Sequence, residues 1–146
     1  MRKNFWKNIP LNDLSSEEWE LLCDGCGKCC LNKFNKTKKC APIYTSVACK
    51  FLDIKKCSCK VYSEREKKRK DCLILSPKNI NKIVNLLPTS CSYRLIYEKK
   101  PLPSWHHLNL PKNKNVHNTK NSVKNFAISE EYVDSSDIVN FIFEKF

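Results

Sequence analysis

Four of the ten cysteines fall within eight consecutive residues, and this cluster constrains the fold more than any other feature of the chain. Residues 23–30 form a C-x2-C-x2-C-C pattern, and the only two glycines among 146 residues, Gly25 and Gly27, flank Cys26. Two-residue spacers let a tight turn direct two sulfurs at one ion, and glycine supplies the positive φ that such a turn needs. The pattern therefore predicts a thiolate knuckle, a turn whose backbone N–H groups point at sulfur.

The other six cysteines lie between residues 40 and 91. Neighbouring side chains diverge, so Cys29 and Cys30 are not expected to chelate one ion together, and Cys30 points either to a second metal or into the core. Cys57 and Cys59 would face one side of a strand and supply a second pair of ligands. Cys40 lies in a lysine-rich stretch and is expected to stay unliganded. The nine expected metal ligands are Cys23, Cys26, Cys29, Cys30, Cys49, Cys57, Cys59, Cys72 and Cys91.

The nine expected ligands do not determine which metal binds or which cysteines share a metal site. The C-x2-C-x2-C spacing occurs in iron–sulfur ferredoxins, and two-residue cysteine spacing is equally typical of zinc sites, so an iron–sulfur cluster and zinc both stay open. The number of thiols suits two metal sites, or one cluster plus one ion. Beyond the thiols, His106 is either a ligand, an acid–base group or a hydrogen-bonded surface side chain, and His107 and His117 are lesser candidates.

The sequence also bears on the cellular setting. No apolar run approaches 18 residues, so no membrane span is expected. The basic N-terminus is not followed by the apolar stretch of a secretory signal, which favours a cytoplasmic, reducing location. In such a compartment many cysteines indicate metal binding or catalysis rather than a disulfide framework.

The formal net charge of +12 raises the possibility of a nucleic-acid partner. However, only four of the 27 basic residues are arginine, the side chain best suited to bidentate base and phosphate contacts. The densest basic run, residues 67–70, is expected on a solvated loop. We therefore expect no dedicated nucleic-acid partner, and no feature of the sequence indicates a protein partner.

No catalytic motif is recognisable. Two glycines cannot build a glycine-rich phosphate-binding loop, and no G-x-S-x-G motif is present. No cysteine stands out as a lone nucleophile with a histidine partner. The sequence therefore assigns no catalytic residue.

Local patterns predict one domain over residues 1–146, of the α+β class, small, irregular and rich in helix, organised around a Cys-ligated metal centre. A capping box at Ser15 and Glu18 predicts a helix that ends near Leu22. The remaining expected elements are helices over residues 76–87, 89–98 and about 136–145, strands over 58–62 and 122–128, a polar loop near 112–121, and an irregular segment over 40–56 with a helical turn near 47–51. The cysteine-rich part is 23–91.

The cluster over residues 23–30 resembles the opening motif of the bacterial CxxCxxCC, or YkgJ-like, zinc- or iron-chelating domain, and further stretches resemble its YcgN-type branch. Those stretches are residues 5–6, 18–20, 47–49, 52–53, 57–62, 65, 71–72, 87–88, 91–95 and 101–106. The resemblance runs over roughly residues 5–140 and departs at His107, where the family more often has proline. It implies metal chelation by the nine cysteines, without Cys40, in a compact bacterial cytosolic protein, and it implies no particular reaction.

Metal binding is thus the leading prediction. Two alternatives stay open: an iron–sulfur or metal-dependent redox enzyme or metal-delivery factor, and a zinc-structured module that binds nucleic acid or protein. The colour of anaerobically purified protein separates iron–sulfur from zinc.

Overall fold

A computed structural model describes residues 1–35, 41–109 and 115–143. The α-helices are α1 (Phe5–Asn8), α2 (Ser16–Leu21), α3 (Arg65–Lys68), α4 (Ile80–Ile83) and α5 (Ser92–Tyr97). The strands are β1 (Leu31–Phe34), β2 (Ile43–Ala48), β3 (Leu52–Asp53), β4 (Ser58–Cys59), β5 (Ile128–Ser129) and β6 (Ile142–Phe143). The 3-10 helices are η1 (Leu11–Asp13), η2 (Lys28–Cys30), η3 (Tyr62–Glu64), η4 (Val84–Leu86), η5 (Val116–Asn118), η6 (Val123–Asn125), η7 (Glu130–Tyr132) and η8 (Ser135–Phe141). The α+β class is as predicted.

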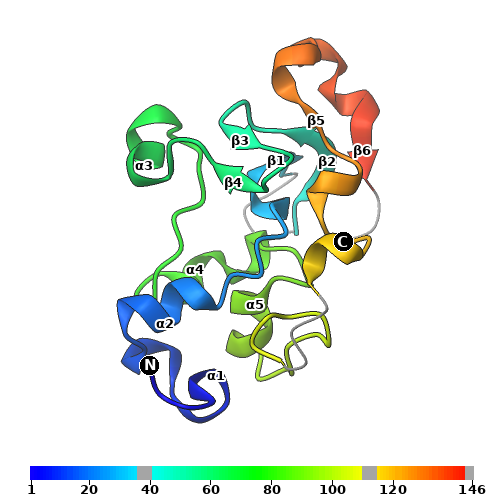
Figure 1. Cartoon of the computed structure of the whole chain (residues 1–146). Helices are drawn as coiled ribbons and strands as arrows, with labels where there is room; N and C mark the ends of the chain where they lie inside the picture. The colour runs from blue at the N-terminus through cyan, green and yellow to red at the C-terminus, as the bar shows by residue number, and fades with distance from the viewer. Residues whose placement is uncertain (36–40, 110–114, 144–146) are drawn as a thin grey trace.

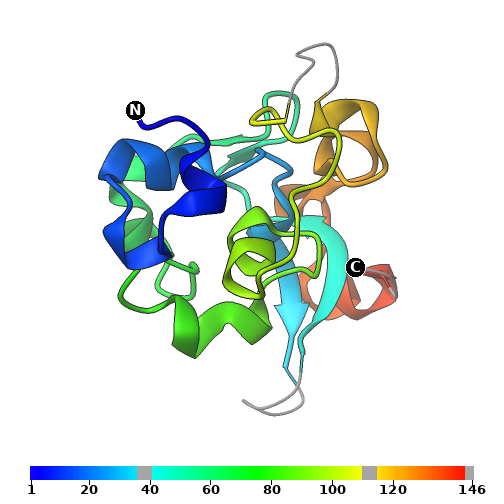
Figure 2. The ribbon, with the colours of Figure 1, turned by 90° about the horizontal axis from the view of Figure 1, so that it is seen from below.

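Most of the α-helices and the strands occupy opposite ends of the molecule, with α3 on the side of the strands (Figure 1). Helices α1, α2, α4 and α5 lie together at one end, and Figure 2 views the protein from that end. Their apolar side chains form one core, which includes Phe5, Trp19, Leu22 and Ile80. A second core lies under the strands, around Leu31 and its buried neighbours. The two parts are tied by a hydrogen bond of 2.6 Å from the Tyr44 hydroxyl on β2 to the Leu86 carbonyl.

Helix α2 confirms the predicted capping box. The Ser15 hydroxyl accepts from the Glu18 N–H, and the Glu18 carboxylate accepts from the Ser15 N–H. The helix buries Trp19, whose carbonyl accepts from the Tyr93 hydroxyl of α5 at 3.0 Å. This contact places the end of α2, and with it Cys23, next to α5.

The two later helices are shorter than predicted. The segment expected to be helical from residue 76 begins its helix only at Ile80, because the Asn79 side chain accepts from the Ser76 N–H and donates to the Ile74 carbonyl, which holds a turn there. Its predicted apolar face is nevertheless buried at Ile80, Val84 and Leu87. Helix α5 lies within the predicted segment, with Cys91 at its N-cap.

The segment predicted to be irregular holds the central strand. Strand β2 pairs antiparallel with β1 and β6 and parallel with β5. The helical turn expected near residues 47–51 is therefore wrong. Residues of β2 are buried on both faces, as at Tyr44, Thr45, Val47 and Ala48, so the segment lacks the alternation that would have revealed a strand.

Both predictions near the C-terminus hold only in part. In place of a strand over 122–128, the chain forms η6 and then the two-residue strand β5. The helix expected over about 136–145 is present as the 3-10 helix η8 and gives way to β6, whose Ile142 and Phe143 remain partly exposed; residues 144–145 lie outside the described segments. Residues 142–143 adopt an extended conformation because they pair with β2 and gain hydrogen bonds between the strands, which they could not form as part of a helix. The polar loop near 112–121 contains η5, and its residues 112–114 lie outside the described segments.

Candidate metal centre

The predicted knuckle is present after α2. Gly25 and Gly27 have φ values of 75° and 77°, the left-handed conformation that the turn was expected to need. Gly27 is also tightly packed, because a Cβ there would lie 2.5 Å from the Val123 side chain. The Cys26 carbonyl accepts from the Val123 N–H at 2.9 Å, so the segment after residue 115 holds the knuckle in place.

Backbone amides act on the sulfurs of this turn. The Gly25 N–H favours the thiolate form of Cys23, and the Lys28 N–H does the same for Cys26. Each donor comes two residues after its cysteine, the arrangement that the knuckle predicts. Burial is the larger influence in both cases: it raises the pKa of Cys23 to about 12 and that of Cys26 well above its ordinary value.

Cys91 joins these thiols from 65 or more residues away, at the start of α5. Burial raises its pKa to about 12, against the opposing effect of the Arg94 and Tyr93 N–H groups of the helix. The charge of Cys29 raises the pKa of Cys23, Cys26 and Cys91, and it also raises the pKa of Cys30 and Cys72. We call Cys23, Cys26, Cys29 and Cys91 the knuckle group.

A buried lysine underlies this group. Lys28 is 1% exposed, and its ammonium donates to the Ser90 hydroxyl at 2.9 Å and to the Asn121 side-chain oxygen at 2.8 Å. Burial lowers the pKa of Lys28, while the charges of Cys26 and Cys91 oppose that change. Lys28 thus brings the Ser90–Cys91 turn and the segment at 121 together beneath the thiols.

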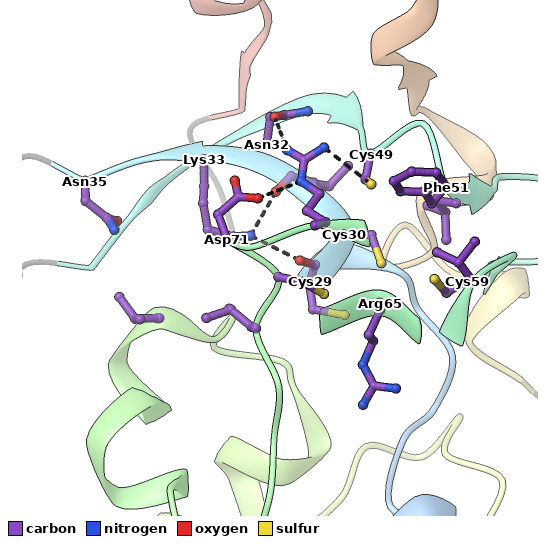
Figure 3. Close-up of a pocket in the computed structure, with 17 residues that line it drawn as sticks. Cys29, Cys30, Asn32, Lys33, Asn35, Cys49, Phe51, Cys59, Arg65 and Asp71 are labelled. Carbon is purple, nitrogen blue, oxygen red and sulfur yellow. Dashed lines mark hydrogen bonds and ion pairs between the residues drawn. The ribbon is translucent and has the colours of Figure 1, made fainter. Parts of the chain in front are cut away.

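A second set of thiols lines a pocket of about 200 Å³ beside the strands. Figure 3 shows Cys30, Cys49 and Cys59 facing this space from three separate segments of the chain. Cys72 also lines the pocket: burial raises its pKa, and the charges of Cys29, Cys59 and Cys49 contribute. We call Cys30, Cys49, Cys59 and Cys72 the pocket group. Cys29 also lines the pocket, at its border with the knuckle group.

Arg69 organises the pocket wall. Its guanidinium donates to the Cys49 sulfur at 3.4 Å, to Glu130 at 2.7 Å and to the Asn32 side chain at 3.2 Å, and it pairs with Asp71 at 2.9 Å. The side chain is 23% exposed, so the prediction that residues 67–70 form a solvated run is wrong at this position. Burial of Arg69 disfavours its protonated guanidinium, and the charge of Cys49 favours it.

Cys29 and Cys30 connect the two groups. Their side chains share a hydrogen bond, which lowers the pKa of Cys29 and raises that of Cys30. Beyond this bond and burial, the charges of Cys29, Cys49 and Cys59 also raise the pKa of Cys30. The Cys30 carbonyl accepts from the Cys49 N–H at 2.8 Å, which fixes the backbone between the groups.

Cys57 is placed differently from the other expected ligands. It precedes β4 with a φ of 51°, so it does not share a strand face with Cys59 as expected. Its sulfur lies 3.4 Å from the Ile54 carbonyl oxygen and 3.5 Å from the Ser122 hydroxyl. Cys40 lies outside the described residues.

The histidines do not converge on the thiols. His106 is fully buried: its Nδ1 accepts from the Leu108 N–H at 3.1 Å, which leaves Nε2 to donate to the Leu22 carbonyl at 3.0 Å. Both ring nitrogens are therefore engaged, which corrects the expectation of a ligand or surface group. His107 stacks on His106 and contacts the Leu21 carbonyl, and Nδ1 of His117 lies 2.8 Å from the Ser122 hydroxyl.

The thiols are gathered without being arranged for coordination. Across residues 1–35, 41–109 and 115–143, no three Cys, His, Asp or Glu side chains are positioned so that they could hold a metal ion. In the same residues, no helix has the length and apolar character required to cross a membrane. Sequence reasoning missed Lys28, Arg69, Asn121 and Glu130; only Lys28 carried a signal, since it lies inside the cysteine motif.

Short helices and small sheets, with thiols gathered between them from distant parts of the chain, define a cysteine-rich α+β protein. The chain is 47% identical over 126 residues to a UPF0260 protein of Gluconobacter oxydans, which covers 86% of this chain and 77% of the relative. It is 41% identical over 144 residues to a UPF0260 protein of Rhodobacter capsulatus, which covers 99% of this chain and 96% of the relative. The chain belongs to the UPF0260 family. No family model and no solved structure matches it.

Proposed function

We propose that this protein binds metal through its cysteine thiolates, as an iron–sulfur cluster or as zinc. The observation that carries the proposal is the orientation of backbone amides toward the thiols of the knuckle group. The Gly25 N–H serves Cys23, the Lys28 N–H serves Cys26, and amides at the start of α5 serve Cys91. Such donors stabilise the thiolate, which is the form of cysteine that binds metal.

The donor set fits these metals. Soft thiolate ligands select zinc, iron–sulfur clusters and Cu(I) over hard cations that prefer oxygen. Each thiol can occupy three staggered χ1 positions, and coordination requires rotations among them, because the present positions do not converge on one point. The resemblance to the CxxCxxCC chelating domain, through the YcgN-type branch, supports the same assignment.

The test is metal analysis of anaerobically purified protein together with its absorption spectrum. We expect stoichiometric metal, with a brown colour and acid-labile sulfide for an iron–sulfur cluster, or a colourless zinc protein. Cys26→Ser should lose most of the metal, because it removes a thiolate from the knuckle. Cys40→Ser is the control and should retain it. Only trace metal in the unaltered protein, or equal loss in both variants, would contradict the proposal.

A further inference from the structure

A cavity of about 940 Å³ lies between the N-terminal segment around α1 and the end of α5. We infer that this cavity binds a small organic anion with a flat aromatic body, as in an aryl carboxylate or an aryl phosphate. Its volume is in the range of about 300–1,000 Å³ that is typical of small-molecule sites. The inference is independent of the proposed metal binding, because no cysteine in the described part of the chain lines this cavity.

The walls of the cavity are mainly apolar. The residues that supply them include Trp6 and Leu11 from the N-terminal segment, and Tyr97, Pro101 and Leu102 from the end of α5 and the chain that follows. Tyr97 is exposed, and Trp6 is only partly covered. Aromatic rings pack well against other rings in offset or edge-to-face contacts, so these two side chains suit a flat ligand.

The charged side chains at the cavity are all cations. Lys7, Lys99 and Lys100 line it, and no aspartate or glutamate among the described residues does so. Lys100 donates to the Glu98 carboxylate at 2.6 Å, whereas Lys7 and Lys99 form no ion pair within residues 1–35, 41–109 and 115–143. The Lys7 ammonium lies 6.0 Å from the centroid of the Trp6 ring, so one small molecule can reach both. The charges therefore complement a ligand with a negative group beside its apolar body.

Lys99 occupies a backbone position that usually belongs to glycine. Its φ is 56°, and it ends α5 in a left-handed turn. The Lys99 N–H donates to the Ile96 carbonyl at 3.0 Å, and the Lys100 N–H donates to the Leu95 carbonyl at 2.7 Å. Glycine is the common residue at such a helix end, because it lacks the Cβ that makes this conformation strained. The chain instead places a long cationic side chain here, at the edge of the cavity.

The Trp6 side chain carries a donor that the protein leaves unsatisfied. Its indole N–H is buried and has no hydrogen-bond partner in the part of the chain that the structure describes. Buried donors are normally paired, because an unpaired one has lost its hydrogen bonds to water. Since Trp6 lines the cavity, a change in the orientation of its ring would bring this N–H to an anionic oxygen of the ligand.

The experiment measures the binding of 2-naphthoate and 2-naphthyl phosphate to the purified protein by titration calorimetry. The two probes distinguish a carboxylate from a phosphate, and we expect at least one of them to bind, with an affinity that falls as salt is added. The neutral 2-naphthamide and the flexible anion decanoate are the comparison ligands. Each should bind about fivefold or more weakly than the better aryl anion, because each lacks one of the two required parts.

Two pairs of variants place the binding at this cavity. Lys99→Gln should weaken binding about threefold to fivefold, while Lys82→Gln changes an exposed lysine of α4 that does not line the cavity and should have no effect. Trp6→Phe should also weaken binding. Trp105→Phe is its control, because the Trp105 indole N–H is likewise buried and unpartnered in the described residues but lies away from the cavity lining.

Three results would overturn the inference. The first is no binding of either aryl anion, and the second is binding of 2-naphthamide or decanoate as tight as that of the better aryl anion. The third is equal affinity in each variant and its control, after thermal unfolding has shown that all four are folded. None of these results bears on metal content, so the proposed function stands or falls separately.

Discussion

The two glycines of the knuckle, Gly25 and Gly27, are constrained differently by the structure, although they are the same type of residue. Gly25 and Gly27 share a positive φ, yet only Gly27 is packed against another side chain, that of Val123. The backbone requirement is therefore common to both glycines, while the steric requirement is specific to one.

Gly27→Ala should destabilise the protein more than Gly25→Ala. Both substitutions place a side chain in the left-handed region, at a cost of about 1–2 kcal/mol. Only at position 27 would the new Cβ lie 2.5 Å from Val123, and such overpacking adds about 1–3 kcal/mol. Denaturant unfolding of the two variants measures the difference, and Val123→Ala in the Gly27→Ala background should recover part of it. Equal losses would show that Val123 moves aside freely.

His106 should make the protein less stable in mild acid. Burial lowers its pKa in the folded state, so below the ordinary histidine value of about 6.5 the unfolded chain binds more protons than the folded one. The stability is present above that value and is lost as the pH falls toward the folded pKa. Unfolding free energy measured from pH 7.5 to 5 should decline in the unaltered protein and less in His106→Gln. The ring of His107 is exposed, so His107→Gln should keep most of the decline. If the decline in His106→Gln equals that of the unaltered protein, groups other than His106 cause it.

At the scale of elements, short segments are held by side chains from distant parts of the chain. Strand β5 and helix η7 are connected to the pocket wall through Glu130, which accepts from Arg69, from the Asn32 side chain at 3.0 Å and from the Lys50 N–H at 2.9 Å. These bonds lower the pKa of Glu130 although burial opposes them. The C-terminal segment is thus part of the support of Cys49.

Glu130→Gln should destabilise the protein by about 1–3 kcal/mol, because it removes a charged acceptor from a partly buried network and takes away one of the two carboxylate partners of Arg69. The adjacent Glu131→Gln changes an exposed carboxylate and should stay within about 0.5 kcal/mol of the unaltered protein. Thermal or denaturant unfolding compares the two. A Glu130→Gln protein as stable as Glu131→Gln would mean that solvent replaces these bonds without loss.

At the scale of the whole molecule, two apolar cores flank a cysteine-rich middle that has little regular structure. The helical core gathers Phe5, Trp19, Leu22 and their neighbours, and the other core lies under β1 and β2. Between residues 49 and 72 the helices and strands are at most four residues long, so local hydrogen bonds contribute little to the stability of that segment.

Removal of metal should therefore loosen residues 23–72 more than helix α4. Structural thiolate sites supply folding free energy on the order of 10 kcal/mol in zinc-finger peptides at neutral pH. Hydrogen exchange before and after complete chelation measures the change, with the amides of α4 as the internal reference. Unchanged protection across residues 23–72 would show that the fold does not depend on metal.

The sequence by itself determined the features that depend on neighbours within a few residues. The capping box of α2, the positive φ of both glycines and the buried face of Ile80, Val84 and Leu87 follow from local spacing, because the hydrogen bonds and side-chain contacts concerned join residues two to four positions apart. The cysteines of residues 23–30 were recognised as candidate metal ligands in the same way, from the two-residue spacing between them.

Only the tertiary structure decided the features that depend on partners far along the chain. Strand β2 exists because β1, β5 and β6 pair with it, and its burial on both faces removes the alternation of a surface strand. Cys91 meets the knuckle group across 62 residues, and Arg69 reaches Glu130 across 61. Such contacts join residues that lie far apart in the sequence, and no local pattern indicates which of them pair. The grouping of the thiols is therefore visible only in the folded structure.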